Sequence, residues 1–262
     1  MDEADHDSGT LSLRLRRNGS GVVAWFRRNW QHRWFRWGSY LLLAGLLGIF
    51  LIWLVFARDL PSVERLKTYE PPLPTHVRSF DGTPVHSYAR ERRVQLRYDE
   101  YPPLLVRAYL AAEDKTFFEH GGIDYPGIVS AMITNVTSSG RPVGASTITQ
   151  QVAKNLLLTN EVSYTRKVRE LLLAKRIEGV LTKQQIMELY LNQIALGRNS
   201  FGVQAASRAY FDKDVGELTL PEFAFLAILP KAPETYGREK NNAKAIARRN
   251  WVLGEMLKNG FI

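Results

Sequence analysis

Three polar clusters between residues 113 and 178 contain residue types that can do chemistry. The first is EDKTFFEHGG, in which Glu113 and Asp114 follow an apolar stretch and precede Phe117 and Phe118. A carboxylate beside apolar and aromatic groups tends to have a raised pKa, which suits a general acid or base near neutral pH. The same pattern also fits an ordinary exposed helix end, so this cluster alone leaves both interpretations open.

The second cluster, GASTITQQVAKN, covers residues 144–155 and has the pattern of an amphipathic helix. Its polar face would carry Thr147, Gln150, Gln151 and Lys154. The solvent-exposed face of a helix usually carries varied charges. A face with two glutamines and a lysine instead indicates a binding surface. The Gly-Ala-Ser-Thr start would offer backbone N–H groups to a phosphate. Before it, TSSGRPV is predicted to form a loop that carries Arg141.

The third cluster, TRKVRELLLAKRIE, covers residues 165–178 and places Arg166 four residues before Glu170. Such a pair lies on one helix face and stabilises a helix by a few tenths of a kcal/mol. From spacing alone, the cluster is best explained as a solvent-exposed helix with ion pairs.

Helical periodicity dominates the elements that must position these clusters. It predicts helices at 104–116, 147–158, 165–180, 183–195, 201–209, 221–229 and 242–258. Two of them would open with capping boxes, Thr147…Gln150 and Thr182…Gln185. Upstream, Asp81-Gly82 at the centre of residues 77–88 predicts a β-hairpin, and alternation from Val94 to Tyr98 predicts a further strand. The expected fold is mainly α with a small β element.

Residues 37–56 read WGSYLLLAGLLGIFLIWLVF, without a charge. As a helix this run would cover roughly 30 Å, the thickness of a bilayer's hydrocarbon core. Arginines are frequent before it and aromatic residues flank it, so the positive-inside rule places the N-terminus in the cytoplasm. A buried core helix and a cleaved signal peptide are the alternatives, the latter because Val55-Phe56-Ala57 loosely resembles a cleavage site. The length of the run favours an uncleaved anchor.

The net charge and the lack of cysteine exclude some classes of function but do not select one. The formal net charge of +9 suits an anionic partner: nucleic acid, an acidic membrane surface or a phosphorylated substrate. The chain has no cysteine, which excludes disulfides and any cysteine-based metal or redox site.

Taken in order, the clusters resemble the five motifs of the family 51 peptidoglycan glycosyltransferases, the glycan-polymerising domains of class A penicillin-binding proteins and monofunctional transglycosylases. The first three motifs match Glu113, Asp114, Phe117, His120 and Gly122; then Gly144, Ser146, Thr147, Gln150, Gln151, Lys154 and Asn155; then Arg166, Lys167 and Glu170. The last two match Glu188, Tyr190, Asn192 and Gly197, and Arg248, Arg249, Val252 and Leu253. The resemblance covers residues 77–262.

The resemblance implies a lysozyme-like, mainly α glycosyltransferase domain with a small membrane-proximal β-containing subdomain. The expected organisation is a basic cytoplasmic segment (1–36), a transmembrane anchor (37–57), a proline-containing linker (58–76) and the transglycosylase domain (77–262). It implies a single-pass protein of the bacterial inner membrane with a periplasmic catalytic domain. The stretch from Asp81 to Tyr101 and the segments ALGRNSFGV and LPKAPETYG look more like those of bifunctional penicillin-binding proteins. We therefore expect this chain to be the N-terminal part of one; a stand-alone transglycosylase is the alternative.

The resemblance also implies roles for individual residues. Glu113 would be the general base that activates the acceptor hydroxyl of lipid II, and Glu170 the second active-site glutamate. Substrate-binding residues would be Asp114, Arg141, Ser146, Thr147, Gln150, Gln151, Lys154, Asn155, Arg166 and Lys167. No cofactor would be obligatory, although a divalent cation, Mg²⁺ or Mn²⁺, could bridge the pyrophosphate. Partners would be lipid II, lipid-linked glycan, the membrane and other cell-wall synthesis proteins, and no nucleic acid.

Three alternatives stay open at this point. A lysozyme-like hydrolase would use Glu113 and Glu170 as an acid and a second carboxylate. A membrane scaffold without activity would not need them. His120 could bind a metal or move a proton, but no second histidine lies at ligand spacing, which favours a packing or hydrogen-bonding role.

Overall fold

The computed structural model describes residues 24–25, 28–57, 60–69, 75–81, 84–88, 94–138, 144–159 and 163–262. The chain divides after Arg58 into two compact units, an N-terminal unit and one from Asp59 to Ile262. The predicted loop residue Arg141 lies outside the described residues.

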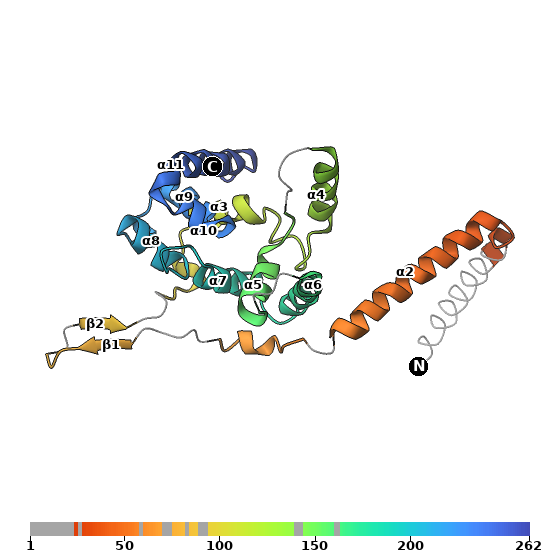
Figure 1. Cartoon of the computed structure of the whole chain (residues 1–262), viewed down its shortest axis with the longest axis horizontal. Coiled ribbons are helices and arrows are strands. Elements are labelled where there is room, and N and C mark those ends of the chain that lie inside the picture. The colour runs from red at the N-terminus through yellow and green to blue at the C-terminus, as the bar shows by residue number, and fades with distance from the viewer. Residues whose placement is uncertain are drawn as a thin grey trace, which may run out of the picture. The chain divides into compact units, whose positions relative to one another are not determined.

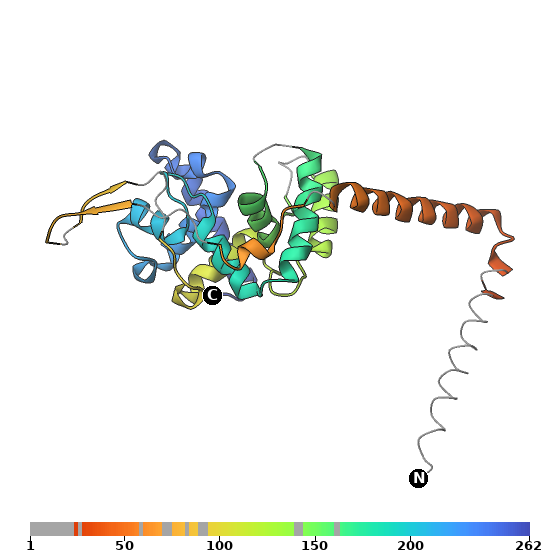
Figure 2. The ribbon, with the colours of Figure 1, turned by 90° about the horizontal axis from the view of Figure 1, so that it is seen from below.

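The N-terminal unit contains one long helix, α2, from Arg33 to Ala57, which is continuous in Figure 2. It begins four residues before the predicted apolar run. The stretch from Arg33 to Leu51 is long and apolar enough to cross a membrane, and none of it is buried. A core helix of a soluble protein would be buried, so that alternative does not fit α2.

The second unit is mainly helical, as predicted. Its longer helices are α3 (Pro103–Glu113), α4 (Tyr125–Thr137), α5 (Ile148–Leu157), α6 (Tyr164–Glu178), α7 (Lys183–Gln193), α8 (Val203–Phe211), α9 (Leu220–Ile228) and α11 (Asn242–Lys258). Shorter helical turns are η1 (Glu64–Leu66), η2 (Tyr98–Glu100), η3 (Val215–Glu217), η4 (Leu229–Lys231), α10 (Pro233–Tyr236) and η5 (Glu239–Asn241). Strands β1 (Thr75–Arg78) and β2 (Pro84–Tyr88) form an antiparallel pair around the predicted hairpin turn.

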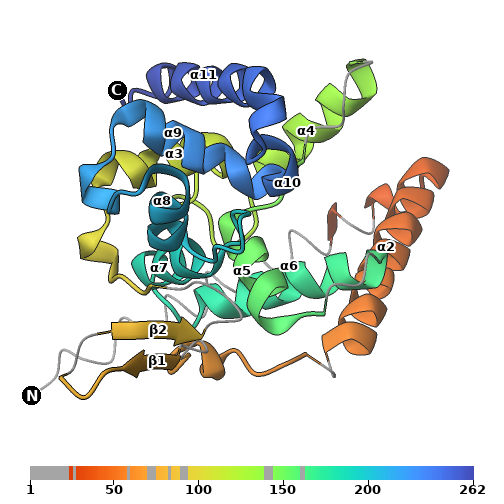
Figure 3. The ribbon, with the colours of Figure 1, turned by 60° about the vertical axis from the view of Figure 1, so that its left-hand side comes forward.

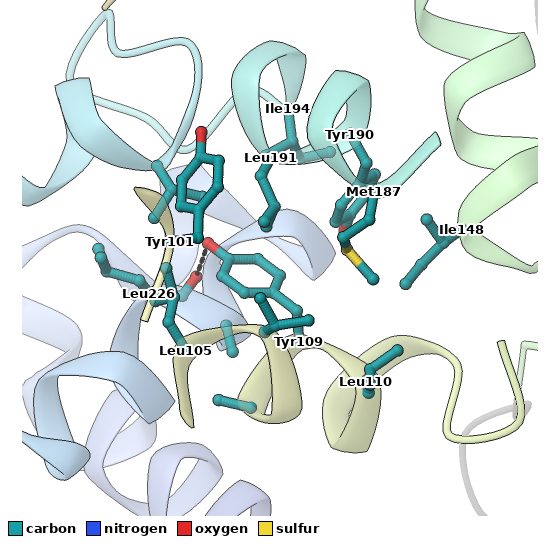
Figure 4. Close-up of a cluster of buried hydrophobic side chains, with 14 of the residues drawn as sticks. Tyr101, Leu105, Tyr109, Leu110, Ile148, Met187, Tyr190, Leu191, Ile194 and Leu226 are labelled. Atoms are coloured by element: carbon teal, nitrogen blue, oxygen red, sulfur yellow. Dashed lines mark hydrogen bonds between the residues drawn. The ribbon is translucent and has the colours of Figure 1, made fainter. Parts of the chain in front are cut away.

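The helices form two neighbouring groups that share one core. In one group α11 and α9 pack on α3, and in the other α5 packs between α6 and α7 (Figures 1 and 3). Figure 4 shows where the groups meet, with Tyr109, Ile148 and Tyr190 fully buried. The Tyr109 hydroxyl donates to the carbonyl of Leu226 at 3.1 Å, which joins α3 to α9. The core therefore fixes the end of α3 relative to the start of α5.

Two sequence predictions of local structure were wrong, and one helix was missed. The first predicted helix ends at Glu113 and not at Thr116, because the backbone of Asp114 leaves the helical conformation, with φ −162° and ψ 79°. Residues 94–97 do not pair as a strand: the Leu96 N–H and carbonyl bind the Asn192 side chain instead, at 3.0 and 2.7 Å. Helix α4 was not predicted, because its sequence, YPGIVSAMITNVT, contains a proline, a glycine and several β-branched residues.

Candidate active site

A cavity of about 780 Å³ opens between the end of α3, the following loop, α4 and residues 144–147. Four residues predicted to be functional line it: Glu113, Asp114, Ser146 and Thr147. The other predicted residues that the structure describes lie behind this wall, on α5 and α6.

Glu113 is the last residue of α3 and is only partly exposed at the cavity. Its Oε2 accepts a hydrogen bond of 2.7 Å from Nε2 of Gln151 on α5. Burial raises the pKa of Glu113, although the Gln151 bond and the positive charges of Arg248 and Lys231 act in the opposite direction. A carboxylate of this kind is a better proton acceptor near neutral pH than an exposed glutamate.

Asp114 is buried and ties the loop after α3 to the start of α5. Its Oδ2 accepts the backbone N–H of Ile148 at 3.0 Å, and its carboxylate contacts Nε2 of His120 at 3.0 Å. Because Nδ1 of His120 accepts the N–H of Gly122, the ring proton is on Nε2 and is donated to Asp114. Burial raises the pKa of Asp114, and both hydrogen bonds oppose that rise. His120 therefore has the hydrogen-bonding role that its isolation in the sequence favoured.

Gly122 places this loop close against α6. Its φ of +89° is one that side-chain-bearing residues rarely adopt, and a Cβ there would lie 2.8 Å from the Ala174 carbonyl oxygen. The Gly122 carbonyl also accepts the Thr147 hydroxyl at 2.8 Å. The loop, α5 and α6 are thus held together directly beneath the cavity.

The start of α5 differs from the prediction of free N–H groups for a phosphate. Asp114 binds the N–H of Ile148, and the Thr147 hydroxyl accepts the N–H of Gln150 at 3.2 Å. Thr147 is buried and already uses its hydroxyl twice. These hydrogen bonds give Thr147 and Asp114 a role in shaping the cavity wall, and substrate contacts of both residues stay predictions.

An ion cluster around the buried carboxylate of Glu170, with two partly exposed cations, lies on the other side of α5. Glu170 is 3% exposed; its Oε2 lies 2.9 Å from Lys167 Nζ and its Oε1 lies 3.3 Å from Arg166 Nε. Lys167 Nζ also donates to Ser146 Oγ at 2.7 Å and to Gln150 Oε1 at 3.3 Å. The predicted Arg166–Glu170 pair is present, but the interpretation as a solvent-exposed face is wrong for Glu170. Through Ser146, the cluster reaches the cavity wall.

Helix α5 connects the two halves of the site. Gln151 faces Glu113, whereas Gln150, one residue earlier, is buried against Lys167. Lys154, one turn further on, is half-buried, and its ammonium group forms no hydrogen bond or ion pair with any residue in the described ranges. Asn155 is exposed. The two glutamines therefore do not share one binding face, as the sequence had suggested, but divide between a carboxylate and a cation cluster.

Sequence reasoning did not identify three basic residues near Glu113 or the cavity. Lys231 and Arg248 act on the Glu113 carboxylate, and Lys175 of α6 lines the cavity beside Gly121. Arg248 stands in the fifth motif and could have been found there. Lys175 and Lys231 had no sequence signal beyond their charge.

The family model for transglycosylases matches residues 81–257, which include every part of this site. The chain belongs to the transglycosylase family. Curated transglycosylase relatives include penicillin-binding protein 1A of Rickettsia felis, 48% identical over 210 residues (79% of this chain, 27% of that protein). That of Neisseria flavescens is 45% identical over 225 residues (86% and 28%). The chain spans about a quarter of the length of these relatives.

Among solved structures, the transglycosylase chain is similar to penicillin-binding protein 1A from Haemophilus influenzae, at 28% identity and a TM-score of 0.40. That match covers 74% of this chain and 19% of the other.

Proposed function

We propose that the chain is a membrane-anchored peptidoglycan glycosyltransferase that polymerises lipid II and releases undecaprenyl diphosphate, with inversion at the anomeric carbon. One observation carries the proposal: α5 joins a partly buried carboxylate at a cavity, Glu113, to a cluster of cations around Glu170. A glycosyl transfer that expels a pyrophosphate needs a base at one end and positive charge at the other. Family membership supports the same reaction class.

In the proposed mechanism, the 4-hydroxyl of the acceptor lipid II attacks the anomeric carbon of the donor glycan. Glu113 takes the hydroxyl proton as the new C–O bond forms, while the bond to the lipid pyrophosphate breaks. Lys154, Arg166 and Lys167 stabilise the negative charge on the leaving group, and Lys154 is suited to this because no described residue neutralises it. Glu170 orients Arg166 and Lys167 and does not abstract the proton.

The proposed mechanism contains no step through a metal ion. In the described part of the chain, no three histidine, aspartate or glutamate side chains are grouped to hold one. The divalent cation that the family resemblance allows, bridging pyrophosphate and carboxylates, stays a prediction.

A lysozyme-like hydrolase is the nearest alternative, and the environment of Glu170 argues against it. A second carboxylate that positions water must be reachable, whereas Glu170 is buried between two cations. We expect lipid II incubated with the detergent-solubilised protein to give long glycan strands on a gel. A protein that only shortens preformed glycan, and makes none from lipid II, would refute the transferase proposal.

The exposed apolar side chains of helix α4 support the proposal that the substrate is bound to a membrane. It has no charged residue, and five of its large apolar side chains are 55–87% exposed: Tyr125, Val129, Met132, Ile133 and Val136. Exposed apolar patches of this kind mark lipid or protein contacts. Because α4 also lines the cavity, a lipid surface beside it would bring lipid-linked substrates to Glu113.

The absence of cysteine allows a direct test of this contact. In the full chain reconstituted into bilayers, an environment-sensitive fluorophore on Val136→Cys is expected to show blue-shifted emission, because position 136 enters the apolar phase. The same label on Glu239→Cys, at an exposed site on η5, should report water. Equal, water-like emission from both positions would contradict lipid contact by α4.

The remaining proposals concern the whole protein. We propose that α2 is an uncleaved anchor in the bacterial inner membrane, with a cytoplasmic N-terminus and a periplasmic catalytic domain. We also propose that the chain is the N-terminal part of a bifunctional penicillin-binding protein and acts beside other cell-wall synthesis proteins. The name of the curated relatives, penicillin-binding protein 1A, supports the placing of the chain in a penicillin-binding protein.

A further inference from the structure

Arg248 is a cation on α11 that has no ion pair with a carboxylate in the part of the chain that the structure describes. Its guanidinium carbon lies 3.6 Å from the centroid of the Trp251 ring, which is cation–π geometry. Its Nε is buried and forms no hydrogen bond with a described residue, although buried polar groups are rarely left unpaired. Burial lowers the pKa of Arg248, and the Glu113 carboxylate is among the groups that oppose this. An arginine remains protonated in a protein, so the site contains a fixed positive charge.

This charge is placed to act on Glu113. Helix α11 packs against α3, of which Glu113 is the last residue (Figure 3). Among the charges that act on Glu113, Arg248 has the largest effect, ahead of Lys231 on η4. Trp251 lies on α11 one turn after Arg248, and its ring fixes the guanidinium without neutralising it.

We propose that Arg248 is a positioning residue for Glu113, held by stacking on Trp251 so that its charge keeps the base as a carboxylate before each transfer. The inference rests on the proposed function, because only a general base must be ionised before it accepts a proton. Burial favours the neutral carboxyl, which cannot accept the hydroxyl proton, and Arg248 offsets that preference.

Other groups face Glu113 from the elements packed around it. Gln151 of α5 donates a hydrogen bond, and Lys231 contributes a second positive charge. Asp114 is a like charge that works against ionisation. The phenols of Tyr109 and Tyr190 are fully buried, and the pKa of each is raised far above the usual value, so both stay neutral. Arg248 and Lys231 are therefore the cations that favour the ionised form of Glu113.

The first experiment titrates Glu113 without using activity. The measurement follows the infrared band of the protonated Glu113 carboxyl as a function of pH. This band is isolated as the difference between the spectra of the full chain and of its Glu113→Gln variant. Because Arg248 lowers the pKa of Glu113, Arg248→Gln should move the midpoint of this titration to higher pH. Arg248→Lys should restore most of the wild-type midpoint, and Trp251→Leu should move it in the same direction as Arg248→Gln but less. An unchanged midpoint in Arg248→Gln would overturn the inference.

The second experiment measures polymerisation across pH. We expect Arg248→Gln to lose roughly ten- to a hundredfold in rate near neutrality, part of what a general base contributes, and to recover at alkaline pH. Lys244→Gln removes an exposed charge one turn earlier on α11 and should leave the profile unchanged. A loss of rate that is equal at every pH would mean that Arg248 contacts substrate or only supports the fold. If the wild-type chain makes no polymer, the proposed function fails, while the infrared titration still decides whether Arg248 controls Glu113.

Discussion

Replacing Glu113 with glutamine is expected to lower the rate of polymerisation by about 10²–10⁴-fold, the usual contribution of a general base. Glutamine keeps the size of the side chain, and its amide oxygen can still accept the hydrogen bond from Gln151, but it cannot take a proton. The measurement is the initial rate of glycan formation from lipid II.

Thermal unfolding separates this effect from a loss of structure. The raised pKa of Glu113 means that the folded state disfavours the carboxylate, so an ionised Glu113 destabilises the fold at neutral pH. Glu113→Gln should therefore unfold at the same or a higher temperature than the wild type. Glu239→Gln, on the exposed turn η5, should change neither rate nor stability. A Glu113→Gln variant that polymerises normally would exclude Glu113 as the base.

The rate of polymerisation should also depend on pH, with an acid limb set by Glu113. Glu113 must be ionised to act, and burial raises its pKa, so the rate should fall as pH decreases through a value above the usual 4.3 or so of a glutamate. Glu170→Gln should lower the rate without moving this acid limb, because Glu170 holds cations and is not the base. A shift of the limb in Glu170→Gln would reverse the two assignments.

Replacing Lys167 with methionine is expected to reduce the rate by about 10²–10³-fold, the range for removing one group that stabilises transition-state charge. Methionine has a similar length and leaves Glu170 paired with Arg166 alone. Ser146 also loses the ammonium that connects the cation cluster to the cavity wall. The maximal rate should fall more than the affinity for substrate, because the charge of the leaving group develops during the reaction.

Lys258 provides a matched control for this change. Like Lys167, it pairs with a glutamate three residues away, Glu255, but its side chain is 72% exposed. Such surface pairs contribute little to stability, so Lys258→Met should retain full activity and nearly the same unfolding temperature. If Lys167→Met and Lys258→Met behave alike, the cluster around Glu170 does not stabilise the leaving group.

Periodicity and capping predicted most of the helices, since those signals are local. The Thr182 capping box is present with both hydrogen bonds, and α11 has the predicted bounds. Helix α4 escaped because its residues have low helix propensity and a proline and a glycine stand in its first turn, although its apolar residues recur at helical spacing. The strand expected at Val94 failed because a side-chain amide, that of Asn192, replaced the partner strand.

The sequence likewise predicted only part of the site. Motif spacing pointed to Glu113 and Glu170, but spacing alone could not show that Glu170 is buried or that Gln150 and Gln151 serve different partners. Those properties depend on tertiary contacts: α5 packs between α6 and α7 and forms hydrogen bonds with the end of α3. The influence of Arg248 on Glu113 likewise exists only because α11 returns to pack against α3.

Because α3 packs against α9 and α11, the surroundings of Glu113 are complete only after those helices have been synthesised. Tyr109 binds the carbonyl of Leu226, 117 residues later, and Arg107 binds that of Phe261, 154 residues later. At about 5–20 residues per second, a ribosome needs several seconds to some tens of seconds to make that intervening chain. Until then Glu113 has neither its apolar surroundings nor Arg248, so a nascent chain should be inactive until residues near its C-terminal helix have emerged and folded.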